Sequence, residues 1–213
     1  MSSPIVLILV PGLTSEAAQD LSFDRPECAR GSLRPLPLEL DPEEVLLSGS
    51  LESGNGTDIR KVLATYGLTT EELDLEEESG DGYELSAVER VRSALALGTD
   101  LVIVRAGVCD RWTRLTAALE GVNLLIVGHS TSPQRSGFVA IGPDIIAGDI
   151  EGSPVDLQPS LLGHFEVLPP PGPAPEGRLL HQIFRWAHPR AEDEIDVWTS
   201  GTGAGSAAGR GLE

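Results

Sequence analysis

A run of six apolar residues, 5–10 (IVLILV), lies near the start of the chain and is followed at once by Pro11-Gly12. An apolar run of this length, rich in β-branched residues and closed by a turn signal, is typical of a strand buried on both faces of a parallel sheet. Three further runs share this character: 101–104 (LVIV), 124–127 (LLIV) and 138–141 (FVAI). Together they predict a central sheet whose two faces are both covered.

Helical patterns lie between the apolar runs. Residues 85–97 carry apolar side chains at helical spacing and end at Gly98. A second helix, capped by Thr57 or Asp58, is expected to reach Tyr66. Further helices are expected to begin at Thr70 and to span residues 111–119, 156–164 and 176–187. Strands that alternate with helices predict an α/β fold: a three-layer sandwich with a mostly parallel central sheet and helices on both faces.

The remaining segments have loop-like compositions. Residues 30–53 are rich in Leu, Pro and Gly, and we expect a short strand or edge segment and a loop there. Residues 169–175 are proline-rich, which predicts a stiff, extended connector. We expect one α/β domain over residues 1–190, and a flexible tail over 191–213 that is first acidic and then rich in Gly, Ala and Ser.

The charge of the chain restricts its partners. It contains 33 acidic and 15 Lys or Arg residues, so its formal net charge is −18. A field of this sign repels nucleic-acid phosphates and anionic lipid, so neither nucleic acid nor a membrane is an expected partner. Cys28 and Cys109 are too few for a disulfide framework or a four-cysteine zinc site. A soluble protein in the reducing cytoplasm fits this composition.

One long segment carries a family resemblance. Residues 135–170 (RSGFVAIGPDIIAGDIEGSPVDLQPSLLGHFEVLPP) are similar to the last third of type I phosphodiesterases, nucleotide pyrophosphatases and cofactor-independent phosphoglycerate mutases of the alkaline phosphatase superfamily. Those proteins have a strand, a Gly-Pro turn, a glycine corner, a helix that begins Asp-Ile-Ala-Pro, and a hydrophobic strand. Here the turn is Gly142-Pro143, and Asp156 stands at the expected start of the helix as its N-cap.

Three shorter segments agree with the resemblance in order. Residues 5–13, 100–114 and 124–130 look like the family strands that lead to Asp-Gly-Leu, Asp-x-x-Gly-His and Asp-His-Gly. The chain is much shorter than typical members of the family. The resemblance therefore implies a reduced member from which the cap domain is absent.

The resemblance also implies which residue of this chain stands at each metal-ligand position of the family. Family members bind two divalent metals, which activate a Ser or Thr nucleophile and hold the transferring group. The first-strand Asp falls at Pro11, and the Asp of Asp-His-Gly falls at Gly128. The His of Asp-x-x-Gly-His falls near Arg114. Only Asp110 and His129 remain as implied metal ligands, which are too few to hold two metals.

The nucleophile that the resemblance implies is best assigned to Ser48, then to Ser50 and then to Thr57. The favoured alternative is that these residues belong to an ordinary turn with serines. His129 is either a site residue or a plain loop histidine. Cys109 is better explained as a small buried side chain than as a thiol nucleophile.

Four arginines flank the predicted carboxyl ends of the strands, where open α/β sheets bind ligands. They are Arg105, Arg111, Arg114 and Arg135. They can bind an anion without a metal, or they can pair with the many surface acids. The second alternative is favoured by the excess of Asp and Glu.

Three functions follow as expectations. The first is a non-catalytic scaffold or interaction protein, with a protein partner or a homodimer and no cofactor. The second is a phosphoric ester hydrolase with an altered site and a divalent metal, Zn²⁺, Mn²⁺ or Mg²⁺. The third is a module that senses an anionic metabolite. The missing ligands favour the first.

Overall fold

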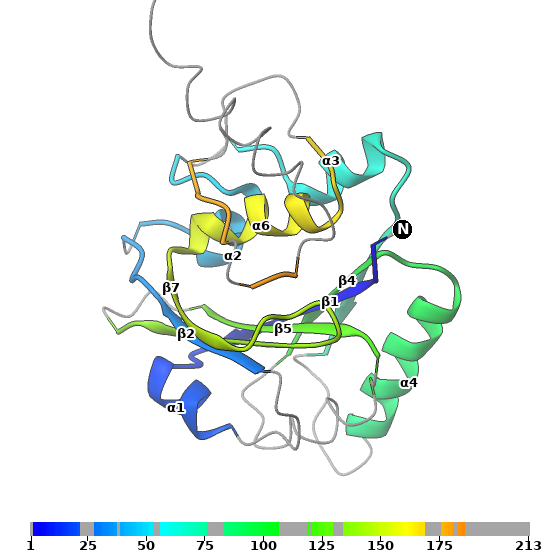
Figure 1. Cartoon of the computed structure of the whole chain (residues 1–213), viewed down its shortest axis with the longest axis horizontal. Coiled ribbons are helices and arrows are strands. Elements are labelled where there is room, and N and C mark those ends of the chain that lie inside the picture. Colours follow the sequence, from blue (N-terminus) through cyan, green and yellow to red (C-terminus); the bar gives the residue numbers. More distant parts are fainter. Residues whose placement is uncertain are drawn as a thin grey trace, which may run out of the picture.

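The computed structural model describes residues 2–21, 28–37, 39–52, 56–75, 83–106, 119, 121–129, 134–168, 176–180 and 183–185, and for residues 83–86 the backbone alone. Its strands form one sheet in the order β3-β4-β1-β5-β6-β2-β7 (Figure 1). They are β1 (Ile5–Pro11), β2 (Cys28–Leu33), β3 (Thr70–Asp74), β4 (Leu101–Arg105), β5 (Asn123–His129), β6 (Ser136–Ile141) and β7 (Gly148–Gly152). Only β6 runs against its neighbours, so the predicted mostly parallel sheet is confirmed.

Helices cover both faces of this sheet. They are α1 (Ser15–Asp20), α2 (Pro42–Ser48), α3 (Ile59–Thr65), α4 (Tyr83–Ala96) and α6 (Leu157–His164), which follows the 3-10 turn η1 (Pro154–Asp156). Helices α2, α3 and α6 lie on one face, and α1 and α4 lie on the other (Figure 1). The α/β three-layer sandwich predicted from the sequence is therefore confirmed.

Strand β1 shows how the apolar run serves both layers. Its alternate residues Ile5, Leu7 and Leu9 belong to the buried cluster under α2, α3 and α6. The residues between them belong to the cluster on the α1 and α4 side. Since successive side chains of a strand point to opposite faces, a run without polar residues fills two cores at once.

Local signals fix several helix ends. Asp58 caps α3, with its carboxylate accepting from the backbone N–H of Arg60 at 2.8 Å. Helix α4 ends before Gly98, whose φ of +86° is a left-handed conformation that glycine adopts without strain. The helices predicted over these two segments are confirmed within a few residues.

Two helix predictions are wrong. Residues from Thr70 form strand β3, which pairs in parallel along its whole length with β4. The acidic residues that suggested a helical first turn instead belong to a strand at the end of the sheet, where Glu72 meets two arginines. Residues 176–180 and 183–185 are also not helical; they pack in irregular form against α2 and α6.

Further predictions are confirmed only in part or lie outside the described residues. Strand β2 overlaps the start of residues 30–53, where a short strand or edge segment was expected, and it is a short strand that lies between β6 and β7. Asp156 does not cap α6 with its side chain, because helical structure already begins at Pro154. The predicted helix over 111–119, apart from Leu119, lies outside the described residues, as do the connector 169–175 and the tail 191–213.

No helix in the described part of the chain is both long enough and apolar enough to cross a membrane.

Candidate functional site at the carboxyl edge of the sheet

The carboxyl ends of the parallel strands meet at one edge of the sheet. Pro11 ends β1 and stands opposite His129, the last residue of β5. Arg105 ends β4 and pairs in register with Leu9 on β1. Arg135 precedes the antiparallel strand β6 and so reaches the same edge. The structure therefore places Arg105, His129 and Arg135 along the edge where open α/β sheets bind ligands.

The Arg105 guanidinium is held by two carboxylates from different elements. Its Nε and Nη2 donate to Oε1 of Glu43 on α2, at 2.7 and 2.5 Å. Its Nη1 donates to Oε2 of Glu72 on β3 at 2.7 Å. Each of its three nitrogen atoms thus already bonds a carboxylate.

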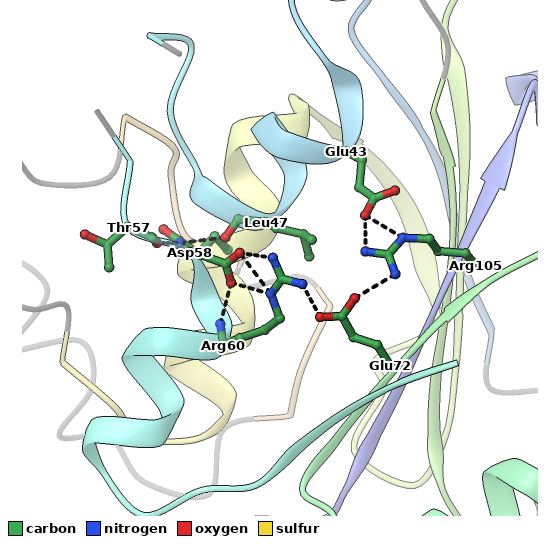
Figure 2. A network of polar contacts seen from close by, with 8 residues as sticks. Glu43, Leu47, Thr57, Asp58, Arg60, Glu72 and Arg105 are labelled. Carbon is green, nitrogen blue, oxygen red and sulfur yellow. Dashed lines mark hydrogen bonds and ion pairs between the residues drawn. The ribbon is translucent and has the colours of Figure 1, made fainter. Parts of the chain in front are cut away.

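The contacts continue into a row of five charged side chains, which we call the charge ladder (Figure 2). Glu72 also accepts from Arg60 on α3, and Arg60 in turn binds Asp58 at the start of the same helix. The ladder runs Glu43, Arg105, Glu72, Arg60, Asp58, with the sign of the charge alternating at each step. It ties α2 and α3 to the end of the sheet that holds β3 and β4.

Burial and pairing act against each other on the acidic members of the ladder. Partial burial disfavours the charged carboxylate of Asp58 and Glu72, and hydrogen bonds from arginine favour it. The second effect prevails, so the pKa of both carboxyls lies below its ordinary value. The same hydrogen bonds raise the pKa of Arg60 and Arg105. Asp58, Glu72, Arg60 and Arg105 are therefore ionised at neutral pH.

Arg135 makes a more exposed pair. Its Nη1 donates to Oε1 of Glu151 at 2.9 Å and to Oγ of Ser32 at 3.1 Å. The side chain of Glu151 is 80 % exposed, so water screens this pair strongly. Of the four predicted arginines, the two that the structure describes, Arg105 and Arg135, thus lie against carboxylates, which is the alternative that the excess of acids favoured.

His129 points toward the α2 layer, because Leu125 and Val127 of the same strand face the cluster under α2, α3 and α6. Its backbone carbonyl accepts from the N–H of Gly12 at 2.9 Å. Four other predicted residues, Cys109, Asp110, Arg111 and Arg114, lie outside the described residues. Among the residues that are described, no three His, Cys, Asp or Glu side chains come together in a way that would hold a metal ion.

Gly128 faces the opposite side of the sheet from His129 and has no room for a side chain. A Cβ atom there would lie 2.1 Å from the carbonyl oxygen of Leu13 and 3.0 Å from the backbone nitrogen of Gly137. That carbonyl also accepts from the N–H of Gly137 at 2.8 Å, so it is held in place. Backbone therefore occupies the space that an aspartate at position 128 would need.

Ser48 lies away from the charged edge. It is the last residue of α2, roughly 8 Å along the helix axis from Glu43, which meets Arg105. Its Oγ accepts from the N–H of Ser50 at 3.4 Å. The structure therefore does not bring Ser48 to Arg105.

The alternative nucleophiles also have contacts that join segments of the fold. Ser50 is 9 % exposed, and its Oγ donates to Oε1 of Glu176 at 3.2 Å. The carbonyl of Thr57 accepts from Nε2 of the buried Gln158 at 2.5 Å, and the carbonyl of Leu47 accepts from the same nitrogen at 2.9 Å. These bonds connect α2 and α3 to α6.

The sequence reasoning missed the carboxylates that hold Arg105. The signal for Glu43 was present: Asp41, Pro42, Glu43 and Glu44 form a capping aspartate, a first-turn proline and two first-turn acids. These residues predict a helix start, but the contact of Glu43 with Arg105, 62 residues away, depends on tertiary packing. Compared with known proteins, the chain matches no protein-family model and no curated protein.

Proposed function

We propose that this chain is a degenerate member of the alkaline phosphatase superfamily that acts as a non-catalytic scaffold or interaction domain. The order of elements over residues 136–164 supports the family assignment. Strand β6, the turn at Gly142-Pro143 and helix α6 follow one another as the resemblance implies. Strand β7 stands where the resemblance implies a glycine corner, and residues 165–168 after α6 do not form the hydrophobic strand that it implies. The assignment rests on the sequence resemblance, which the order of these elements supports.

The packing at Gly128 is the observation that carries the non-catalytic role. The resemblance implies a metal-binding aspartate at this position, and the carbonyl of Leu13 leaves no space for one. Pro11, at the other implied aspartate position, has no ligating side chain. A two-metal site needs several oxygen and nitrogen ligands on each metal. The chain offers Asp110 and His129 for this purpose.

The contacts of Arg105 and Arg135, the two arginines of the predicted anion site that the structure describes, argue against the anion-sensing alternative. An anionic metabolite would have to displace Glu43 and Glu72 from Arg105, or Glu151 from Arg135. The two carboxylates on Arg105 are only partly exposed, so they compete effectively for the guanidinium. A scaffold role uses these contacts as they stand, because the pair of Arg105 with Glu43 holds α2 on the sheet.

The test combines metal content with turnover. Purified protein would be dialysed with and without Zn²⁺, Mn²⁺ and Mg²⁺, and its metal content measured alongside hydrolysis of p-nitrophenyl phosphate and bis-p-nitrophenyl phosphate. The variants are His129→Ala and Asp110→Ala. Asp149→Ala, at an exposed position of β7, serves as the matched control.

We expect less than one metal per chain after dialysis and no turnover above the blank in any of the four proteins. One retained metal per chain, together with turnover that disappears in Asp110→Ala and His129→Ala and persists in Asp149→Ala, would overturn the proposal. Light scattering over a range of concentrations then tests self-association, the simplest form of the interaction role. A strictly monomeric protein directs the search to a different protein partner.

A further inference from the structure

The chain returns after α6 to close the helical layer with a segment that we call the clasp, residues 176–180 and 183–185. Its first half is fixed by polar contacts to buried groups. Oδ1 of Asp156 accepts from the N–H of Arg178 at 2.7 Å, and Oγ of Ser160 accepts from the N–H of Leu180 at 2.9 Å. Gly177 lies so close to η1 that a Cβ atom would stand 1.9 Å from the carbonyl oxygen of Val155.

The second half of the clasp enters the core. Ile183 and Phe184 are both fully buried, and they belong to the cluster under α2, α3 and α6. The carbonyl of Ile183 accepts from the N–H of Ile146 at 2.9 Å, and the N–H of Arg185 donates to the carbonyl of Asp144 at 2.5 Å. The clasp therefore seals the core beside the loop that follows β6.

One titratable side chain lies beneath this seal. His164 ends α6 and is 8 % exposed. Its ring lies 4.6 Å from the ring of Phe184 and 5.1 Å from that of Phe165, measured between centroids. Its Nε2 lies 2.8 Å from the carbonyl oxygen of Ser3, ahead of β1. His164 thus touches the clasp, the end of α6 and the start of the chain.

These contacts define the neutral form of the ring. A carbonyl oxygen only accepts, so Nε2 carries the proton and Nδ1 is bare. Acid adds the second proton at Nδ1. None of the described residues offers Nδ1 a hydrogen-bond acceptor, so protonation would create a buried donor and a buried charge together.

The charged groups around His164 only partly offset this cost. Two carboxylates attract a positively charged His164 ring. They belong to Asp144, which precedes the residue that pairs with Phe184, and to Glu166, which lies just after α6. Arg185 adds a positive charge in the clasp itself. Residues 2–4, which include the hydrogen-bond partner Ser3, contain no charged side chain. Burial outweighs the two carboxylates, so the pKa of His164 lies below its ordinary value.

We propose that His164 is a pH-sensitive latch for the clasp, which stays closed on the neutral ring and opens locally when the ring is protonated. Opening would detach Phe184 and the N–H of Arg185 while the sheet remains folded. It would also expose the apolar socket that Ile183 and Phe184 fill. The latch does not depend on the scaffold role, since it involves neither Asp110 nor His129.

Hydrogen exchange of the full-length protein tests the latch. Exchange would be followed by mass spectrometry at about pH 8 and about pH 5, with correction for the intrinsic pH dependence of exchange. The peptide that contains the amides of Ile183 and Arg185 reports on the clasp, and the peptide from β1 reports on the sheet. We expect corrected exchange in the clasp to rise by about tenfold at the lower pH, with no change in β1.

His164→Gln is the matched variant, because glutamine can still donate to the carbonyl of Ser3 but does not titrate. We expect its clasp to exchange equally at both pH values. An acid-induced rise that persists in His164→Gln, or a rise that appears equally in β1, would overturn the latch.

A titration of the unmodified protein can refute the latch even if the variant folds poorly. In nuclear magnetic resonance spectra, the ring signals of Phe184 should shift with the same midpoint as those of His164. Ring signals of Phe184 that stay constant through the titration of His164 would refute the coupling.

Discussion

Gly128 shows at the scale of one residue why a ligand position in this chain is closed. A Cβ atom there would overlap the carbonyl of Leu13, which is itself bonded to Gly137. We predict that Gly128→Ala lowers the free energy of unfolding by about 1–3 kcal/mol, because backbone on two segments must shift. Urea unfolding followed by circular dichroism measures this loss.

Gly152→Ala is the control for that prediction. Gly152 is the last residue of β7, and a Cβ atom there would meet only side-chain atoms, the nearest being Cδ1 of Leu180 at 3.3 Å. We expect a change of about 0.5 kcal/mol or less. Equal losses for the two variants would show that the overlap at Gly128 is relieved without cost.

The sequence alone shows that Gly128 has no side chain that could ligate a metal. It does not reveal the overlap, because the overlap joins segments that are far apart along the chain.

At the scale of elements, the charge ladder attaches α2 and α3 to the sheet through Arg105 and Arg60. We predict that Arg105→Gln costs about 1–2 kcal/mol of unfolding free energy at low salt, because Glu43 and Glu72 then face each other without their shared cation. Glu43→Gln should cost less, since Arg105 keeps Glu72. The difference should shrink in about 1 M salt, which screens these partly exposed charges.

Chemical unfolding of the two single variants and of the double variant, at low and high salt, gives the coupling between Arg105 and Glu43. Equal losses for the two single variants, unchanged by salt, would contradict the ladder as an electrostatic attachment.

The sequence predicts some elements of the fold and not others. The buried strands β1, β4, β5 and β6 were all predicted, because each is a continuous apolar run.

Of the elements that carry the ladder, α3 and β4 were predicted from the sequence, whereas β3 was predicted as a helix and α2 was not predicted. Strand β3 reads Thr-Glu-Glu-Leu-Asp, and only Leu73 of its five residues is buried. A polar strand at the end of a sheet lacks the apolar run that reveals a central strand. Helix α2 has seven residues, too few for a helical period to stand out. The edge of the sheet could thus be predicted, whereas the partners of Arg105 depend on tertiary pairing.

At the scale of the whole molecule, the buried and paired groups predict two separate losses of stability in acid. The pKa of His164 is below its ordinary value in the folded protein, so the unfolded chain takes up that proton first. Stability from the neutral ring is therefore complete above about pH 6.5 and falls as the pH drops below it. Asp58 and Glu72 also have lowered pKa values, but as acids. Their contribution persists to about pH 4 and is lost as the pH falls through their folded pKa values.

The net charge of −18 complicates any single curve, because protonation of many acids also relieves repulsion among them. Differences between variants remove this common background. The free energy of unfolding of the unmodified protein minus that of His164→Gln should fall between about pH 7 and pH 5. The corresponding difference for Glu72→Gln should stay constant there and fall only below about pH 4. A Glu72→Gln difference that already falls near pH 6 would mean that the ladder is not held by ionised carboxylates, and a flat His164→Gln difference would mean that the buried ring takes up its proton without cost.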